Sequence, residues 1–155
     1  MIETSRLLLR PFTLDDAPAL RAYRNIPDVY RYQAWPAPLT PKGAEEQIKE
    51  YLGQSPTEPG WFQYAVEHKA DRVLVGDLGL WLHENLRQAE IGFTLAPAYQ
   101  RRSYGTELVT AILDHLLAGG IHRVSAECDP RDTPSAALLK RVGFQPEGCR
   151  PASRR

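Results

Sequence analysis

The sequence lacks the features that mark membrane, secreted and nucleic-acid-binding proteins. No apolar run approaches the roughly 18 residues that a membrane span needs. The N-terminus, MIETSRLLLRPF, has an acid at Glu3 and an apolar run of only Leu7–Leu9, too short for a signal peptide. Nineteen basic residues balance nineteen acidic ones, so no field of one sign favours nucleic acid or a membrane surface. We therefore expect a cytoplasmic protein with neither kind of partner.

Metal and disulfide patterns are also missing from the sequence. The two cysteines, Cys128 and Cys149, form neither a C-x-x-C motif nor a metal-ligand spacing. One disulfide between them is arithmetically possible, but two thiols in a reducing compartment are the favoured interpretation. The four histidines show no ligand spacing, so we expect them at the surface or in the core, and we expect no metal. They are His68, His83, His115 and His122.

What the chain does contain is typical of a soluble globular protein: 155 residues, 43% hydrophobic and 25% charged. We expect one domain over residues 1–150 and a short flexible tail over 151–155. Periodicity, caps and turn residues divide the domain into strands and helices. The expected strands are Arg6–Phe12, Trp61–Glu67, Val73–Leu82, Glu90–Leu95 and Arg123–Glu127, with a strand-like piece from Phe144. The expected helices begin at Thr13, Thr40, Ser103 and Ser135.

This order of elements predicts an α/β fold of the α+β type, with a mixed sheet flanked by helices. The connection from strand 90–95 through helix 103–118 to strand 122–128 is expected to be a right-handed parallel crossover. On the 73–82 strand, Gly76 and Gly79 indicate close neighbours or a bulge. One buried face of this strand is expected to carry Leu74, Leu78, Leu80 and Leu82. One stripe of the 103–118 helix is expected to carry Leu108, Val109, Ile112, Leu113, Leu116 and Leu117.

The stretch Ala89–Glu107, AEIGFTLAPAYQRRSYGTE, predicts an anion site. A strand there enters a short turn and a helix follows at once, so helical N–H groups without intrahelical partners face the loop. The helix dipole adds roughly half a positive charge, and Arg101 and Arg102 stand beside it. We expect a cofactor with a pyrophosphate. A G-x-x-x-x-G-K-[ST] loop is excluded because Gln100 and Thr106 stand where Gly and Lys are required, and no G-x-G-x-x-G spacing occurs.

Gln100–Gly105 resembles the [Q/R]-x-x-G-x-[G/A] pyrophosphate loop of the GNAT superfamily of acetyl-CoA-dependent N-acetyltransferases. Other pieces resemble motifs of the same family in the same order. They are RLLLR at Arg6–Arg10, AEIGF at Ala89–Phe93, SYGTE at Ser103–Glu107, HRV at His122–Val124, DPRDTPS at Asp129–Ser135, LKRVGF at Leu139–Phe144 and EG at Glu147–Gly148. The resemblance covers nearly the whole chain and is closest to the RimJ/RimL branch, which acetylates protein N-termini and has many small-amine relatives. It implies a mostly antiparallel mixed sheet with helices on both faces, and acetyl-CoA as co-substrate.

The resemblance implies that backbone N–H groups of Gln100–Thr106 surround the pyrophosphate, with Arg102 as a counter-ion. The alternative is a plain connection between strand and helix. Backbone groups of Phe93–Leu95 are expected to pair with the pantetheine arm. Ser103 stands where the family has glycine, so its side chain either crowds the phosphates or donates a hydrogen bond. The residues expected at the cofactor are Phe93, Thr94, Leu95, Gln100, Arg101, Arg102, Ser103, Tyr104, Gly105, Thr106, Asp132 and Lys140.

Glu90 and Ser135 are the expected catalytic residues. An acid buried in an apolar run has a raised pKa, which suits Glu90 as the base for an ammonium acceptor, directly or through water. The alternative for Glu90 is an ion pair with Arg87 or Arg123. In this family branch, the serine that matches Ser135 protonates the leaving thiolate.

Asp132 stands where the family has an asparagine that orders the cofactor arm. An ionised carboxylate only accepts hydrogen bonds, so Asp132 lacks the donor that the asparagine has. Asp132 or Thr133 is alternatively a simple cap of the 135–142 helix. In the family, the region of the first two helices forms the acceptor side of the site. Tyr30, Tyr32 and Trp35 therefore either line the amine pocket or pack their loop onto the sheet.

The expected function is direct transfer of an acetyl group to an amine in a ternary complex, without a metal. The alternative is a GNAT-fold protein that binds acyl-CoA with little or no catalysis, indicated by Ser103, Asp132 and the short C-terminus. Family members usually continue for a further strand, and residues 151–155 are too few to supply it. We therefore expect either an exposed sheet edge or a second subunit that covers it, and we favour a homodimer.

Overall fold

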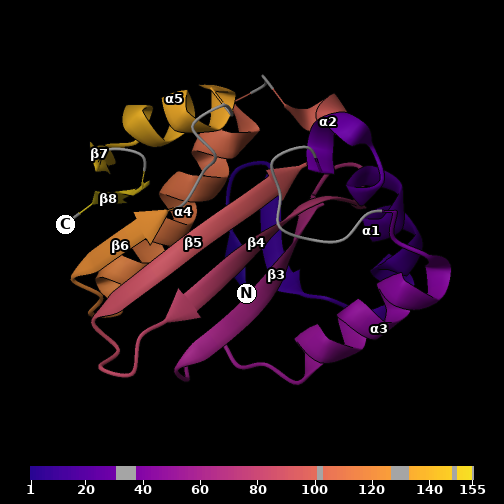
Figure 1. Cartoon of the computed structure of the whole chain (residues 1–155), viewed down its shortest axis with the longest axis horizontal. Helices are drawn as coiled ribbons and strands as arrows, with labels where there is room; N and C mark the ends of the chain where they lie inside the picture. Colours follow the sequence, from indigo (N-terminus) through magenta and orange to yellow (C-terminus); the bar gives the residue numbers. More distant parts are fainter. Residues whose placement is uncertain (31–37, 101–102, 127–132, 148–149, 155) are drawn as a thin grey trace.

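One eight-stranded sheet contains all the strands of the described chain (Figure 1). The computed structural model describes every residue except 31–37, 101–102, 127–132, 148–149 and 155. The strand order is β1-β2-β3-β4-β5-β6-β8-β7. The strands are β1 Ile2–Glu3, β2 Leu7–Pro11, β3 Gly60–His68, β4 Val73–Leu82, β5 Gln88–Leu95, β6 Arg123–Ala126, β7 Gln145–Glu147 and β8 Arg150–Arg154. The helices are η1 Leu14–Asp16, α1 Ala17–Arg24, α2 Pro27–Tyr30, α3 Pro41–Leu52, η2 Pro97–Tyr99, α4 Tyr104–Ala118 and α5 Thr133–Arg141.

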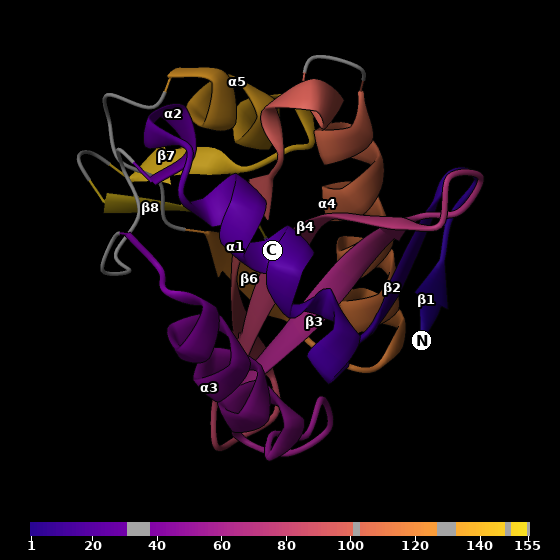
Figure 2. The ribbon, with the colours of Figure 1, turned by 90° about the vertical axis from the view of Figure 1, so that its right-hand side faces the viewer.

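The pairing confirms the predicted mixed sheet. Neighbouring strands are antiparallel throughout the described chain, except that β5 and β6 are parallel. The connection between these two strands runs through α4, as the crossover prediction requires. Helices cover both faces of the sheet (Figures 1 and 2). α4 packs on one face in a large hydrophobic core, and α1 and α3 pack on the other face in a smaller one.

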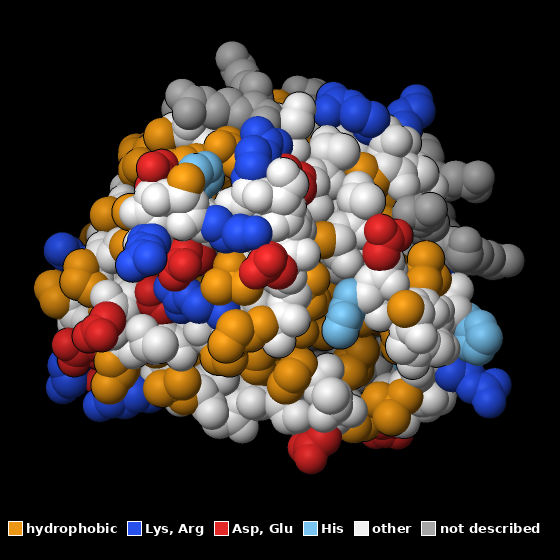
Figure 3. All heavy atoms as spheres, turned by 180° about the vertical axis from the view of Figure 1, so that it is seen from behind, with side chains coloured by type: hydrophobic (Ala, Val, Ile, Leu, Met, Phe, Trp, Pro, Cys, Tyr) orange, Lys and Arg blue, Asp and Glu red, His pale blue; other side chains and the backbone are white. Residues whose placement is uncertain are grey.

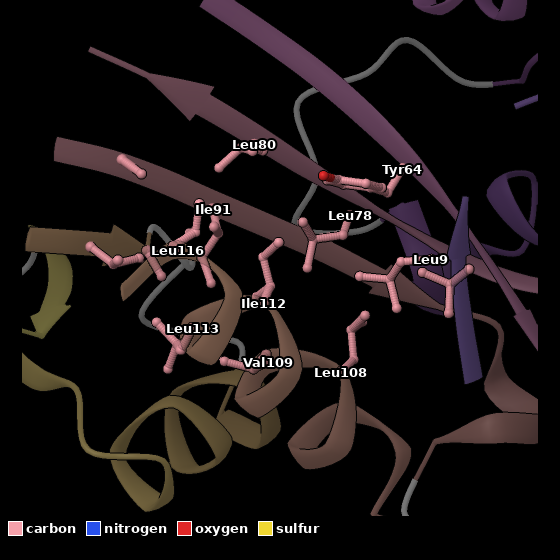
Figure 4. Close-up of a cluster of buried hydrophobic side chains, with 14 of the residues drawn as sticks. Leu9, Tyr64, Leu78, Leu80, Ile91, Leu108, Val109, Ile112, Leu113 and Leu116 are labelled. Atoms are coloured by element: carbon pink, nitrogen blue, oxygen red, sulfur yellow. The ribbon is translucent and has the colours of Figure 1, made fainter. Parts of the chain in front are cut away.

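The buried side of α4 meets the sheet through one apolar stripe (Figure 4). Leu108, Val109, Ile112 and Leu113 are fully buried in the larger core, against residues of β2 to β6. Leu117 was predicted on the same stripe but is 38% exposed, so that prediction is wrong. The reason is its position in the last turn of α4, at the margin of the stripe.

The face alternation of β4 changes at a bulge. Val66 pairs with Gly76 and Glu67 pairs with Leu74, so β4 has an extra residue, Val75, between them. Val75 and the later leucines of β4 belong to the larger core, whereas Leu74 packs against the smaller core. The prediction that Leu74 shares a face with Leu78, Leu80 and Leu82 is therefore wrong, because a bulge reverses the two-residue period. The predicted irregularity at Gly76 is confirmed, since a Cβ there would lie 2.2 Å from the backbone oxygen of Thr94.

The C-terminal residues supply the strand that the sequence was expected to lack. Arg150–Arg154 forms β8, which pairs with β6 on one side and with β7 on the other. The expectation that residues 151–155 are too few for a partner strand is therefore wrong. Backbone pairing requires no apolar side chains, so the hydrophobic pattern does not indicate this strand. This strand also removes the reason given for a homodimer.

Candidate functional site

Within the described residues, the parallel pairing of β5 with β6 covers only the first half of β5. Its register runs from Gln88 opposite Arg123 to Ile91 opposite Ala126, whereas the pairing of β5 with β4 continues to Leu95. From Gly92 onward, no strand within the described ranges lies along the edge of β5 that faces away from β4. Figure 1 shows β5 extending beyond the end of β6. The last four residues of β5 therefore present a length of strand edge.

The hydrogen-bond phase of β5 determines which backbone groups point to this edge. His83 N donates to Gln88 O at 3.0 Å, and Ala96 N donates to Val75 O at 2.8 Å. In an antiparallel pair, alternate residues bond to the same neighbour. The β5 residues that bond toward β4 are therefore Gln88, Glu90, Gly92, Thr94 and, just past the strand, Ala96.

Phe93 and Leu95 consequently direct their N–H and C=O groups away from β4. The side chain of Gln100 takes one of these groups, because Gln100 Nε2 donates to Leu95 O at 2.9 Å. Within the described residues, no strand pairs with the outward N–H and C=O of Phe93 or with the N–H of Leu95, which are groups that a strand-like ligand can use. Thr94, named with them in the sequence prediction, directs its backbone groups to β4 instead.

The first turn of α4 lies directly after this edge. The first α-helical bond of α4 is Glu107 N to Ser103 O, at 3.1 Å. The N–H groups of Tyr104, Gly105 and Thr106 therefore precede any intrahelical partner, as expected for an anion site. Ser103 precedes the helix with φ 64° and ψ 11°, in the left-handed region. The position thus has the conformation that glycine adopts without strain, which explains why the family pattern has glycine there.

Gly105 and Thr106 bring α5 against the start of α4. A Cβ on Gly105 would lie 2.3 Å from Leu138 Cδ1, so glycine permits the close approach of the two helices. Arg141 Nη1 lies 3.5 Å from Thr106 Oγ1, which places a guanidinium beside the first turn of α4. Lys140, the basic residue that the sequence prediction selected, is exposed. In Figure 3, basic side chains gather at the upper edge, the end of the molecule where α5 lies in Figure 1.

The side chain of Tyr104 points into the protein rather than toward a ligand. Tyr104 is 7% exposed and belongs to the larger core. Its hydroxyl lies 2.9 Å from His68 Nε2, and the Arg6 guanidinium lies 3.9 Å from its ring centroid. What Tyr104 offers at the surface of this site is therefore its backbone N–H. Arg101 and Arg102, the other side chains predicted here, lie outside the described residues.

Ser135 lies in the first turn of α5 and is half-buried. It precedes Leu138, Leu139 and Val142 by three, four and seven residues, so it shares their inward-facing stripe. Leu138 on this stripe meets the start of α4, which places Ser135 on the side of α5 that faces the site. Thr133 is already helical, so the prediction that it caps this helix is wrong. Asp132, the other predicted cap and cofactor contact, lies outside the described residues.

Glu90 lies on the opposite face of the sheet from α4. Its neighbours Ala89 and Ile91 are buried in the larger core, so the half-buried Glu90 side chain points to the face that carries α1 and α3. On this face Glu90 is opposite Trp81, and the next pair toward the free edge is Gly79 with Gly92. Gly92 is exposed, and a Cβ there would meet no atom within 4 Å. The position of Gly92 is therefore open, whereas Gly79 lies under the Gln63 side chain, whose Oε1 would be 3.0 Å from a Cβ there.

A buried polar network anchors α1 on this second face. Asp77 of β4 accepts a short hydrogen bond from the Tyr23 hydroxyl and one of 2.8 Å from Gln63 Nε2. Arg24 Nη2 lies 3.2 Å from the same carboxylate and donates to the Tyr51 hydroxyl at 3.0 Å. Burial, and then the Asp77 charge, raise the pKa of Tyr23 well above its usual value, so its hydroxyl remains a donor. The network fixes the end of α1 that leads into α2.

The predicted acceptor-pocket residues follow that point of the chain. Tyr30 is the last residue of α2, and its side chain is outside the described part of the structure. Tyr32 and Trp35 lie within residues 31–37, which are also not described. Cys128 and Cys149, which were predicted to be two thiols and not a disulfide, also lie outside the described residues.

Sequence reasoning missed residues that support the site from behind. His68, Arg6 and Glu107 all contact the start of α4 or the Tyr104 side chain, and Arg141 borders it. The only available signal was the position of Arg6 in RLLLR and of Glu107 in SYGTE, both within motifs of the resemblance. Nothing in the sequence pointed to His68. Within the described ranges, no three His, Cys, Asp or Glu side chains are grouped as metal ligands, and no helix is long and apolar enough to cross a membrane.

Comparison with known proteins gives one family. A model described as an acetyltransferase (GNAT) domain matches residues 6–145. Among curated relatives, the uncharacterized N-acetyltransferase YnaD of Bacillus subtilis is 28% identical over 150 residues, covering 95% of this chain and 84% of YnaD.

Solved structures share the fold across nearly the whole chain. RimL, a ribosomal L7/L12 alpha-N-protein acetyltransferase in complex with coenzyme A, has a TM-score of 0.80 and 18% identity, covering 97% of this chain and 94% of RimL. The microcin C7 self-immunity acetyltransferase MccE, in complex with acetyl-CoA and AMP, has a TM-score of 0.83 and 18% identity, covering 97% of this chain and 93% of MccE. At this identity the likeness concerns the fold.

Proposed function

The chain belongs to the GNAT acetyltransferase family, and we propose that it transfers an acetyl group from acetyl-CoA directly to a primary amine. The amine belongs to a protein N-terminus or to a small molecule. The observation that carries the proposal is the adjacency of two features: the edge of β5 at Phe93 and Leu95, and the N–H groups of Gly105 and Thr106 at the start of α4. The first suits an extended amide-bearing arm and the second suits a pyrophosphate.

Acetyl-CoA fits these groups chemically. Its pantetheine arm contains two amides, which pair with the backbone groups of Phe93 and Leu95 as an added strand does. Its pyrophosphate accepts hydrogen bonds from the first turn of α4, with Arg102 and Arg141 as neighbouring cations. Gln100 contributes by holding Leu95 O and thereby the turn between strand and helix. The family resemblance assigns a further contact to Asp132.

Glu90 and Ser135 are assigned the proton transfers. Glu90 accepts a proton from the acceptor ammonium, directly or through one water, and the neutral amine attacks the thioester carbonyl. A C–N bond forms and the C–S bond breaks. Ser135 gives a proton to the departing thiolate and regains one from the nitrogen of the new amide. The exposed backbone at Gly92 leaves room near Glu90 for the acceptor. Most of the acceleration comes from holding the two substrates in attack geometry, and no metal is required.

Glu90→Gln is the direct test of the base. We expect kcat to fall by about 100-fold or more, because a general base contributes typically that much, while CoA affinity is unchanged. Gln88→Glu is a matched control, since position 88 lies on the same face two residues away and an added acid there leaves the rate unchanged. If Glu90→Gln lowers kcat and CoA affinity by the same factor, Glu90 has a structural role and is not the general base.

A second candidate is an acyl-CoA-binding protein of the same fold with little or no turnover. The left-handed Ser103 favours it, because a serine side chain occupies space that the glycine pattern leaves open. CoA raises the melting temperature under both proposals, whereas only the enzyme releases CoA thiol when an amine is added. Pantetheine, which lacks the pyrophosphate, should stabilise the protein far less than CoA. Equal stabilisation by the two would contradict the anion site at α4.

We further propose a cytoplasmic location and, as partners, amine substrates without nucleic acid or membrane. The equal numbers of basic and acidic residues support this, since the chain as a whole has a net charge of zero. A homodimer is retained as a proposal to be measured by light scattering, although β8 removes its original argument.

A further inference from the structure

Three aromatic rings meet behind the start of α4. The ring of His68, the last residue of β3, lies 5.4 Å from that of Tyr104 and 5.5 Å from that of Tyr99. The rings of Tyr99 and Tyr104 lie 5.7 Å apart in a T-shaped arrangement. Tyr99 ends η2 and Tyr104 begins α4. His68 therefore contacts Tyr99, just before Gln100, and Tyr104, the first residue of α4.

Hydrogen bonds orient the His68 ring. Its Nδ1 lies 3.3 Å from the backbone N of Asp71, and its Nε2 forms a hydrogen bond of 2.9 Å with the Tyr104 hydroxyl. The Asp71 carboxylate also lies 3.3 Å from Nδ1. The β3–β4 turn thus fixes the imidazole, and the imidazole fixes Tyr104.

Arg6 holds the other side of the Tyr104 ring. Its guanidinium lies 3.9 Å from the ring centroid, within the range of a cation–π contact. Glu107 in turn accepts from Arg6 Nε at 2.7 Å, from the Arg6 backbone N at 2.9 Å and from the Thr4 hydroxyl. The first residue of α4 is consequently enclosed by the side chains of Arg6, just before β2, of His68 in β3 and of Tyr99 in η2, and by its own helix.

These contacts surround a strained residue. Ser103, adjacent to Tyr104, has φ 64°, which costs a non-glycine residue conformational energy. Such conformations persist where the surrounding structure over-determines them. His68 and Arg6 contact Tyr104 and so restrain the backbone directly after Ser103. His68 also contacts Tyr99 and so restrains the backbone before Gln100.

We propose that His68 is a positioning residue for cofactor binding: it holds Tyr99 and Tyr104 so that Ser103 keeps a glycine-like conformation and the α4 N–H groups stay aimed at the pyrophosphate. The inference rests on the proposed function, because it assumes that CoA binds at the start of α4. It gives a role to a histidine that the sequence pattern left without one. His68 acts through Tyr104 and Tyr99 and has no contact with the reacting atoms.

The test is a double-mutant cycle on CoA affinity, measured by titration calorimetry. We expect His68→Leu to weaken CoA binding about tenfold in the natural background. In the Ser103→Gly background, where the strain is absent, the same change should weaken it by no more than about threefold. In steady-state assays, His68→Leu should raise KM for acetyl-CoA and leave kcat and the acceptor KM unchanged.

Conservative and control variants separate positioning from general stability. His68→Gln keeps an Nε2 donor for Tyr104 and should restore most of the affinity, and it remains informative if His68→Leu folds poorly. His83→Leu is the matched control, since His83 also makes a T-shaped ring contact, with Trp81 at 5.6 Å, and accepts a turn N–H, from Asn85 at 3.3 Å. It should leave CoA affinity unchanged.

Two outcomes overturn the proposal in different ways. If the natural protein binds CoA but His68→Leu costs the same in both backgrounds, or costs nothing, the positioning role is wrong and the proposed function stands. If the natural protein binds no CoA, the proposed function fails and the positioning role fails with it.

Discussion

At the scale of single residues, the glycines and Ser103 show what a sequence can and cannot specify. The sequence identified Gly76, Gly79 and Ser103 as unusual, because glycine in a strand and serine at a glycine position both break a pattern. It did not specify the reason for each. Gly76 is required by the Thr94 backbone, Gly79 lies in a glycine pair with Gly92, and Ser103 has a left-handed conformation. These differences depend on neighbours that are distant in sequence.

Gly76→Ala should lower the free energy of unfolding by about 1–3 kcal/mol, the usual cost of overpacking. Its new methyl would lie 2.2 Å from the backbone oxygen of Thr94, which cannot move without disturbing β5. Gly92→Ala is the control, since its methyl meets no atom within 4 Å, and it should change stability by no more than about 0.5 kcal/mol. Urea denaturation measures both. Equal effects of the two substitutions would contradict the packing described at Gly76.

At the scale of elements, helix starts and the crossover were predictable because they depend on local signals. Thr40 caps α3 by accepting from Gly43 N at 2.9 Å, and the parallel β5–α4–β6 unit follows from handedness. Two features of the site were not predictable. In the described residues the register of β6 with β5 runs to Ala126, and β8 pairs with the opposite edge of β6; neither pairing has a hydrophobic signature. The strand edge at Phe93 and Leu95 depends on how far β6 pairs, so it could be expected only from the resemblance.

The start of the first helix makes a pH-dependent contribution to stability. Burial raises the pKa of Asp16, but hydrogen bonds from Arg10 and from the Thr13 backbone N–H outweigh it and hold the pKa below its usual value. These bonds are 2.8 and 2.9 Å from Arg10 and 2.8 Å from Thr13. Because the folded-state pKa is lowered, the contribution is complete above the unfolded pKa of about 4 and is lost as the pH falls through the folded value.

Asp16→Asn should therefore lower the melting temperature by a few degrees at pH 7, the size expected for loss of a helix cap in a chain of this length. The difference from the natural protein should shrink as the pH falls below about 4. Asp15→Asn, at the exposed neighbouring position, is the control and should follow the natural protein at every pH. A constant difference between Asp16→Asn and the natural protein across the acid range would contradict the role of the Asp16 charge. Calorimetry at a series of pH values measures all three proteins.

At the scale of the whole molecule, acidic and basic side chains are interspersed over much of the face in Figure 3, in keeping with a net charge of zero. The proposed binding site is therefore local, at the β5 edge and the start of α4. In the proposal, the edge of β5 and the start of α4 hold acetyl-CoA, and the face with Glu90 and Gly92 receives the amine. An enzyme built this way joins the substrates across β5.

The central claim is that this chain moves an acetyl group from acetyl-CoA to an amine. The most direct measurement follows CoA thiol and acetylated product in the same reaction, with a panel of peptides that have free N-termini and of small primary amines. We expect one thiol for each acetyl group found by mass spectrometry on the amine, and no thiol release without the amine. If CoA binds but no member of the panel is acetylated, the binding-only candidate is favoured. If CoA does not bind, the account of the β5 edge and the α4 start is contradicted.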